Sequence, residues 1–217
     1  MTVSSDRDRA LDLCPSLRAI IPELEIYERL LRQWQPKINL VSDQTLPELW
    51  TRHFADSAQI LDQFPGATRW ADLGSGAGFP GMVLALLLKS RPGAIVHLIE
   101  SDQRKAAFLR AVSRETGAPT LIHCARISRV LPKLAGEIDA ISARALAPLA
   151  DLVAWSRELL LKNAVGAFLK GEDWRDELTA VSAADSLEFN CFASVTHPAA
   201  RVITVVSKSP TDRKAPP

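Results

Sequence analysis

Residues 70–81 read WADLGSGAGFPG, and this stretch decides how the rest of the chain is interpreted. An apolar run ends at Leu73, three alternate glycines follow, and a second apolar run of helical length begins at Gly81. Glycines allow a tight turn and a close approach of a ligand to the backbone. A helix that starts directly after such a turn offers unpaired N–H groups and the positive end of its dipole. The pattern therefore predicts a strand, a ligand-binding turn and a helix, in that order.

Two classes of ligand use a turn of this kind. Residues 76–81 match the G-x-G-x-x-G pattern of dinucleotide-binding folds. Residues 72–78 place an acid before G-x-G-x-G, as in methyltransferases that use S-adenosylmethionine (AdoMet). We favour AdoMet because the dinucleotide pattern starts two residues after the strand ends, and because Asp72 would repel a pyrophosphate. Too little chain remains for the second catalytic region of a dehydrogenase, and a purely structural turn is the other alternative.

Glu100 ends the second predicted strand, in the run HLIE. A carboxylate at that place can accept two hydrogen bonds from the ribose hydroxyls of a nucleoside lying over the sheet edge. The alternative is a solvated strand end. With Asp72, Gly74, Gly76 and Gly78, Glu100 makes up the cofactor site predicted from the residues alone.

After Gly66 short apolar runs alternate with longer amphipathic ones. The predicted strands are 69–73, 95–100, 120–124, 138–142 and 165–170. The predicted helices between and after them are 81–89, 103–116, 127–133 and 148–160. Alternation at this spacing is typical of βαβ units and a parallel sheet.

The two ends of the chain differ from this pattern. The first 66 residues are predicted to be helical, chiefly over 22–36 and 46–64, and a further helix is expected near 174–183. Two extended runs, 187–196 and 201–207, are close enough in sequence to form an antiparallel pair. The polar, proline-rich tail 209–217 is expected to be disordered. We predict one structural unit, with a helical cap (1–66) beside a core (67–208).

The bulk properties exclude several classes of protein. The net charge of +1 over 217 residues does not by itself indicate a nucleic-acid partner. Three widely spaced cysteines and four histidines show neither a disulfide pattern nor metal-ligand spacing, so we expect no metal. The longest apolar run, 82–88, is far below the roughly 20 residues that span a bilayer, and no signal peptide is evident. We therefore expect a cytoplasmic protein.

Taken together, these residues resemble one family: the bacterial small-subunit ribosomal RNA guanine-N7 methyltransferases (RsmG, also called GidB). The resemblance covers about residues 30–208. Its motifs are weak singly and specific in this order: Trp34 with NLVS (39–42), RHFADS (52–57), DLGSGAGFPG (72–81), KAAFL (105–109), SARALAPL (142–149) and LKG (169–171).

The resemblance implies a Rossmann-like class I AdoMet-dependent methyltransferase, with a seven-stranded, mostly parallel sheet, an antiparallel C-terminal strand and an N-terminal helical extension. It implies methylation of N7 of one guanine, guanine 527, in 16S rRNA, with S-adenosylhomocysteine as product. The partner would be 16S rRNA in the 30S subunit or an assembly intermediate, and we expect a monomer. The implied AdoMet contacts are Gly74, Phe79, Glu100, Ile127, Ser128 and Arg144. The family often has an acid where this chain has Ser128, so contact there would come from the backbone.

Guanine N7 carries an in-plane lone pair, so no proton has to leave before it attacks the methyl group. We therefore assign no catalytic acid or base; the enzyme has to hold N7 in line with the methyl. The candidates for positioning are Arg52, His53, Asp56 and Ser57, on a predicted helix where Arg52 and Asp56 share a face. That face either closes over the cofactor or target base, or holds an intrahelical ion pair with a buried histidine.

RNA binding requires a basic surface, and residues 101–134 supply one. They contain seven Lys or Arg against two acids, a net charge of +5. The predicted RNA contacts are Arg104, Lys105, Arg126, Arg129 and Lys170. The alternatives are an ordinary charged helix face, and for Lys170 a solvated strand end. Arg144, just after the predicted fourth strand, would contact cofactor or RNA, or form a salt bridge.

Three other functions stay open from the residues. These are a methyltransferase for another RNA or a small acceptor, an NAD(P)-binding oxidoreductase, and a non-catalytic AdoMet-binding regulator. Trp34, Trp50 and Trp70 are expected in the core rather than stacked on bases.

Overall fold

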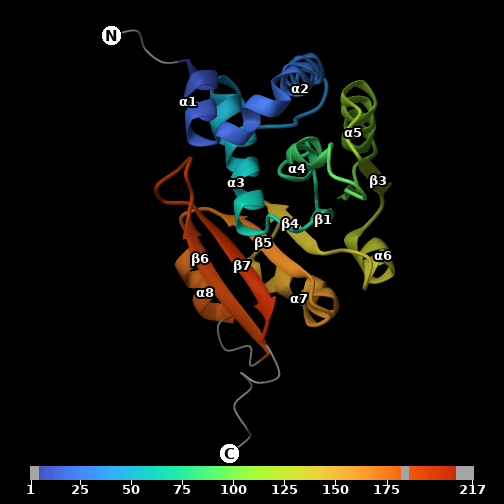
Figure 1. The fold of residues 1–217 in the computed structure, drawn as a ribbon, viewed down its shortest axis with the longest axis vertical. Helices are drawn as coiled ribbons and strands as arrows, with labels where there is room; N and C mark the ends of the chain where they lie inside the picture. The colour runs from blue at the N-terminus through green and yellow to red at the C-terminus, as the bar shows by residue number, and fades with distance from the viewer. Residues whose placement is uncertain (1–4, 182–185, 209–217) are drawn as a thin grey trace, which may run out of the picture.

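The computed structural model describes residues 5–181 and 186–208. The expectations for the tail 209–217 and for the last two residues of the helix 174–183 lie outside that range. A seven-stranded sheet with the order β3-β2-β1-β4-β5-β7-β6 forms the centre (Figure 1). Its strands are β1 (Arg69–Leu73), β2 (Ile95–Glu100), β3 (Thr120–Cys124), β4 (Ala140–Arg144), β5 (Val165–Lys170), β6 (Leu187–Ala193) and β7 (Arg201–Ser207).

Strands β1 to β5 run parallel, and β7 lies antiparallel between β5 and β6. The chain moves outward from β1 to β3 and then crosses back to β4, so the strand order reverses between β1 and β4. In open sheets of this kind ligands bind at the carboxyl ends of the strands beside that reversal. The predicted Rossmann-like fold, its parallel sheet and its antiparallel C-terminal strand are confirmed.

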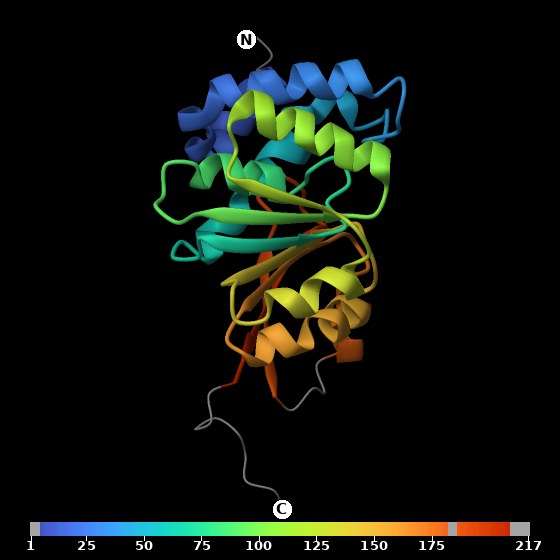
Figure 2. The same cartoon turned by 90° about the vertical axis from the view of Figure 1, so that its right-hand side faces the viewer.

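Helices cover both faces of the sheet (Figure 2). Trp70, Leu98 and Leu169 pack on one face with α2 (Ile21–Trp34), α3 (Asp56–Gln63), α4 (Gly81–Leu88) and α5 (Gln103–Thr116). Leu73 and Phe168 pack on the other with α6 (Ile127–Val130), η4 (Leu131–Leu134), α7 (Leu149–Leu161) and α8 (Trp174–Val181). Neighbouring strand residues alternate between the two clusters, so the buried strands are apolar on both faces.

Two elements of the region predicted to be helical were not located individually from the sequence: α1 (Asp6–Leu13) and the 3₁₀ helix η1 (Pro15–Ile20). The α1 sequence DRDRALDL is mostly charged, so it shows little of the apolar periodicity that the prediction used. Its Ser5–Asp8 capping box was a usable signal. The Asp6 carboxylate accepts hydrogen bonds from the Trp50 and Thr51 backbone amides, at 2.8 and 3.3 Å, and so fixes α1 on the next part of the cap.

The helix predicted over 46–64 consists of three pieces. They are the 3₁₀ turn η2 (Leu46–Glu48), the π-helical segment η3 (Trp50–Ala55) and α3. A π-helical turn is wider than an α-helical one and occurs mostly at functional sites. The intrahelical ion pair of Arg52 and Asp56 that was left open as an alternative does not form within the described residues, because Asp56 pairs with Arg144 on β4 instead.

Strand β4 lies two residues further along the chain than predicted. The Asp139 carboxylate accepts from the backbone amides of Thr68 and Arg69 and pairs with the Arg69 guanidinium, at 2.9 Å. Those bonds hold Asp139 at the strand's start, and pairing with β1 begins at Ala140. Arg144 is consequently the last residue of the strand and does not follow it, contrary to the prediction from the sequence.

Candidate active site

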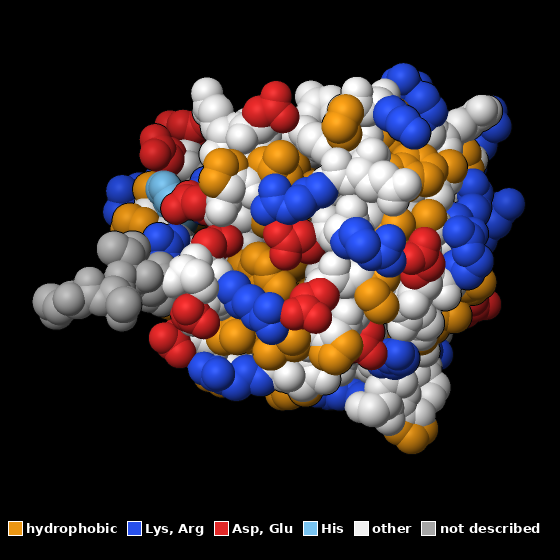
Figure 3. All heavy atoms as spheres, turned by 90° about the horizontal axis from the view of Figure 1, so that it is seen from above, with side chains coloured by type: hydrophobic (Ala, Val, Ile, Leu, Met, Phe, Trp, Pro, Cys, Tyr) orange, Lys and Arg blue, Asp and Glu red, His pale blue; other side chains and the backbone are white. Residues whose placement is uncertain are grey.

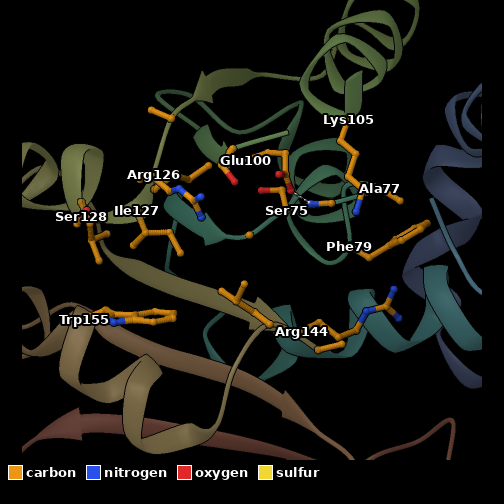
Figure 4. Close-up of a pocket in the computed structure, with 18 of the residues that line it drawn as sticks. Ser75, Ala77, Phe79, Glu100, Lys105, Arg126, Ile127, Ser128, Arg144 and Trp155 are labelled. Carbon is orange, nitrogen blue, oxygen red and sulfur yellow. Dashed lines mark hydrogen bonds between the residues drawn. The ribbon is translucent and has the colours of Figure 1, made fainter. Parts of the chain in front are cut away.

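A cavity of about 740 Å³ opens at the carboxyl ends of β1, β2 and β4 (Figure 4). Its volume lies within the range of cofactor pockets, roughly 300–1,000 Å³. The glycine turn forms one wall, the start of α6 another, and the segment after β4 a third. It is lined by Leu40, Gly74, Ser75, Gly76, Ala77, Phe79, Ile99, Glu100, Ser101, Lys105, Ala125, Arg126, Ile127, Ser128, Leu131, Pro132, Arg144, Ala145, Leu146 and Trp155.

The glycine turn takes the shape that its sequence predicts. Gly74 and Gly76 have φ values of +60° and +55°, in the left-handed region that L side chains rarely adopt. The Ser75 amide donates to the Ile99 carbonyl at 3.0 Å, and this bond attaches the turn to the end of β2. At Gly74 and Gly76 the turn therefore exposes its backbone to the cavity, with no side chain in between.

Glu100 joins the turn to the next helix. Its Oε2 accepts from the Gly76 amide at 2.9 Å, and its Oε1 accepts from the Asp102 amide at 2.7 Å. Each carboxylate oxygen can accept a further hydrogen bond. Glu100 is 8% exposed and lines the cavity, so its carboxylate is fixed in place with lone pairs left for a ligand.

Asp72 lies beneath the cavity and does not line it. It is fully buried, and the Ser142 hydroxyl donates to its Oδ1 at 2.7 Å. Its Oδ2 has no hydrogen-bond partner within residues 5–181 and 186–208. Burial raises the pKa of Asp72 to about 6, while the Ser142 hydroxyl and the positive charge of Arg144 act in the opposite direction. Asp72 therefore supplies negative potential from below the turn.

Arg144, whose side chain is 17% exposed, lies at the centre of a second group of side chains. Its guanidinium lies 4.9 Å from the centre of the Phe79 ring, donates from Nη2 to His53 Nδ1 at 2.6 Å, and pairs with Asp56 at 3.4 Å. Because arginine is a donor only, His53 must be neutral with its proton on Nε2, which lies 2.9 Å from the Thr45 hydroxyl. Burial, followed by the charges of Arg144 and Arg52, lowers the pKa of His53 to about 3.

Phe79 connects the glycine turn to the N-terminal cap. Its ring stacks on Tyr27 at 5.3 Å and contacts His53 at 4.8 Å. The Tyr27 hydroxyl donates to the Ala77 carbonyl within the turn. The cap thus holds the turn through an aromatic cluster, a role for Tyr27 that sequence reasoning missed although its helical position was recognised.

A second cavity, of about 590 Å³, lies beside the first. Leu40, Arg144 and Ala145 line both, so these three residues form the boundary between them. Ala145 has a φ of +50°, an unfavourable value for a residue with a Cβ, which is found chiefly at functional sites. The other lining residues are Val41, Ser42, Thr45, Arg52, His53, Asp56, Leu169, Lys170, Gly171, Glu172, Asp173, Glu177, Ser194, Thr196, His197, Ala200 and Arg201.

The structure brings most of the predicted cofactor residues together. Gly74, Gly76, Phe79, Glu100, Ile127, Ser128 and Arg144 line the first cavity. Gly78 does not, because it packs against Tyr27 and Met82 inside the turn. Of the positioning candidates, Arg52, His53 and Asp56 line the second cavity. Ser57 is fully buried and donates to the His53 carbonyl within the helix, so it faces neither.

The predicted RNA contacts lie in four different places. Lys105 and Arg126 line the first cavity, Arg129 lies at a smaller hollow beside β3, and Arg104 is exposed near Asp102. Lys170 is neither solvated nor free for phosphate: its ammonium pairs with Glu177 at 2.6 Å and donates to the Ala147 carbonyl at 2.9 Å. Lys and Arg side chains gather along the edge of the molecule where α5 lies, the right-hand side in Figures 1 and 3.

Sequence reasoning missed two residues of the first cavity that stand out. Leu40 reaches it from the loop after α2, held there by Gln35, whose Oε1 accepts from the Leu40 and Val41 amides at 3.1 and 3.2 Å. Trp155, on α7, is 45% exposed and lines the cavity opposite the glycine turn (Figure 4). A large aromatic residue outside the buried apolar stripe of an amphipathic helix was the available signal.

Within the described ranges no group of three His, Cys, Asp or Glu side chains is placed to hold a metal ion. None of the helices described there is long and apolar enough to cross a membrane. Trp50 and Trp70 are buried in the core as expected, while Trp34 is partly buried against it.

Comparison with solved structures supports the fold. A cofactor-bound mycobacterial protein, Rv0187, superimposes with a TM-score of 0.65 over 96% of this chain and all of its own, at 17% identity. The S-adenosylhomocysteine-bound methyltransferase PaMTH1 of Podospora anserina gives 0.62 over 86% of this chain and 88% of its own, at 11% identity. At these identities the likeness concerns the arrangement of the chain alone.

Comparison of sequences is more specific. The chain is 46% identical over 194 residues to a ribosomal RNA small subunit methyltransferase G from a Bradyrhizobium species, covering 89% of this chain and 87% of the relative. It is 45% identical over 207 residues to the protein of that name from Methylobacterium nodulans, covering 95% and 97%. The family model described as rRNA small subunit methyltransferase G matches residues 20–201, a range that contains the glycine turn, Glu100 and both cavities' shared wall. On this evidence the chain belongs to the rRNA small subunit methyltransferase G family.

Proposed function

We propose that the protein transfers the methyl group of AdoMet to N7 of one guanine of 16S rRNA, guanine 527 by family resemblance. The observation that carries the proposal is the fixed carboxylate of Glu100 beside the glycine turn, in a cavity of cofactor size. The family membership supports the rRNA acceptor.

The first cavity fits AdoMet by the chemistry of its walls. Glu100 would accept from the ribose hydroxyls, and Ile127 with Ser128 would lie against the adenine. The buried Asp72 suits a ligand that carries positive charge, because a cation nearby stabilises the ionised carboxylate. When bound, AdoMet supplies an electrophilic methyl group on a sulfonium.

The remaining side chains suit an acceptor that needs no base. His53 is neutral, but both of its nitrogens are engaged, by Arg144 and Thr45. Asp56 accepts from Thr196, Gln59 and Arg144 and is equally committed. The protein's part is then to position the base in line with the methyl group, a task that rigid, fully bonded side chains perform well.

The rRNA would approach over the basic side of the molecule. Lys105 and Arg126 at the cavity, with Arg104 and Arg129 nearby, place positive charge where phosphates of a loop would lie. We propose that the protein acts as a monomer in the cytoplasm, on 16S rRNA within the 30S subunit or an assembly intermediate, and requires no metal.

The test is methyl transfer from labelled AdoMet to isolated 30S subunits that lack the modification, followed by mapping of the labelled base. The proposal predicts stoichiometric label at N7 of a single guanine. Label on another base, or a protein that binds AdoMet and transfers nothing, would contradict it. The second result would favour a non-catalytic AdoMet-binding regulator.

A further inference from the structure

The second cavity contains two kinds of charged side chain. The deeper charges are paired: Arg144 with Asp56, and Lys170 with Glu177. Arg201 also has partners, since its Nη1 donates to the Pro198 and Ala200 carbonyls at 2.7 Å and its guanidinium lies 5.0 Å from the Trp174 ring.

The side chains around the opening differ. Arg52, Glu172 and Asp173 line the cavity, and none of their side chains has a hydrogen bond or ion pair within the described residues. Glu172 and Asp173 are exposed and Arg52 is half-buried. Among residues 5–181 and 186–208, therefore, one cation and two carboxylates at the opening have no protein partner, whereas the charges deeper in the cavity are paired.

This combination suits one kind of ligand. A lone phosphate would be repelled by the two carboxylates, and a simple cation by Arg52. A guanine nucleotide satisfies both: its N1–H and N2–H are parallel donors that a carboxylate accepts together, and its phosphate suits an arginine. Adenine presents an acceptor at N1, which a carboxylate opposes.

The relative position of the two cavities indicates how a guanine base would be oriented in the second one. Glu172 and Asp173 line only the second cavity, whereas the boundary residues Leu40, Arg144 and Ala145 also line the first. In guanine, N7 lies on the opposite side of the ring system from N1 and N2. A base whose N1–H and N2–H face the carboxylates therefore turns N7 toward the boundary and the cofactor cavity.

From this arrangement we propose that the second cavity receives the acceptor guanine, with Glu172 or Asp173 accepting from N1–H and N2–H and Arg52 binding the phosphate. The inference rests on the proposed function and identifies the binding site of its acceptor base. Its volume of about 590 Å³ is within the range of small-molecule sites, so a flipped-out nucleotide fits. Glu172 and Asp173 would then determine the choice of base.

The first experiment fills the cavity. Ser42 is exposed and lines only the second cavity, so Ser42→Trp places a large ring there. Gln44→Trp is the matched control, because Gln44 is exposed on the same loop and lines neither cavity. We expect both variants to bind S-adenosylhomocysteine as the wild type does, and Ser42→Trp alone to methylate 30S subunits more slowly, by about tenfold or more.

The second experiment tests the base. In the presence of S-adenosylhomocysteine, GMP should raise the melting temperature of the wild type more than AMP does. The double variant Glu172→Gln with Asp173→Asn should lose this difference, and its KM for 30S subunits should rise by about tenfold with cofactor affinity unchanged. Glu188→Gln, an exposed acid on β6, serves as the control.

The outcomes distinguish failure of the proposed function from failure of the proposed guanine site. A wild type that does not methylate 30S subunits overturns the proposed function. If the wild type methylates 30S subunits, two results would overturn only the proposed guanine site. One is full activity of Ser42→Trp, and the other is a double variant that still prefers GMP.

Discussion

Arg144 and His53 form a hydrogen bond of 2.6 Å between the end of β4 and the π-helical segment of the N-terminal cap. The same guanidinium lies over Phe79 and lines both cavities. One side chain therefore connects the cap, the glycine turn and the boundary between the proposed cofactor and acceptor sites.

Arg144→Lys keeps the positive charge and removes the planar guanidinium group with its several donors. Lysine cannot contact His53, the Arg52 carbonyl and Asp56 together, so we expect the free energy of unfolding to fall by about 1–3 kcal/mol and methylation to fall further than this loss explains. Denaturant titration and single-turnover methylation measure the two effects. Wild-type methylation by a folded Arg144→Lys protein would remove Arg144 from the site.

The low pKa of His53 predicts how stability depends on pH. The imidazole titrates near 6.5 in the unfolded chain and near 3 in the fold. Between these values the unfolded state binds the extra proton, so the contribution of His53 is complete above about pH 6.5 and is lost as the pH falls toward 3. His53→Gln should flatten the stability curve over that interval. An equal slope in both proteins would show that His53 is not held neutral.

Asp72 makes stability depend on pH in the opposite direction. Its pKa is raised in the fold, so the folded state binds the extra proton between about pH 4 and about pH 6, and stability is lost as the pH rises through that interval. Asp72→Asn should therefore raise the melting temperature of the ligand-free protein above pH 6. The substitution should also lower the affinity for AdoMet more than the affinity for S-adenosylhomocysteine, because S-adenosylhomocysteine lacks the sulfonium charge. Calorimetry with both ligands checks this, and an equal loss for both would exclude a charge effect.

Gly76→Ala tests the glycine turn against a matched substitution. Gly76 and Gly117 both have positive φ values, +55° and +67°, and neither substituted Cβ would meet an atom closer than 3.6 Å. Both alanines should thus cost a similar backbone strain of about 1–2 kcal/mol. Only Gly76→Ala should lower the affinity for S-adenosylhomocysteine, because Gly117 caps the far end of α5. Equal ligand affinity in the two variants would argue against the turn as the binding element.

The sequence contained enough information to predict the sheet and the turn. Short apolar runs with glycine between strand and helix are local signals, and the first three strands were predicted with their observed bounds. The side-chain partners were not predictable in this way. Lys170 meets Glu177, and Asp56 meets Thr196, only after distant elements have packed. For the same reason Asp72 belongs to the predicted motif yet lies under the cavity, and the boundary at Ala145 has no counterpart in local sequence.

We propose that the cavity at the glycine turn binds AdoMet through Glu100. Isothermal titration of the wild type and Glu100→Gln with S-adenosylhomocysteine and with NAD tests it most directly, because the variant keeps the size of the side chain and loses its charge. We expect the wild type to bind S-adenosylhomocysteine and not NAD, and the variant to bind S-adenosylhomocysteine with an affinity lower by about tenfold or more. Binding of NAD by the wild type, or equal affinity of both proteins for S-adenosylhomocysteine, would contradict it.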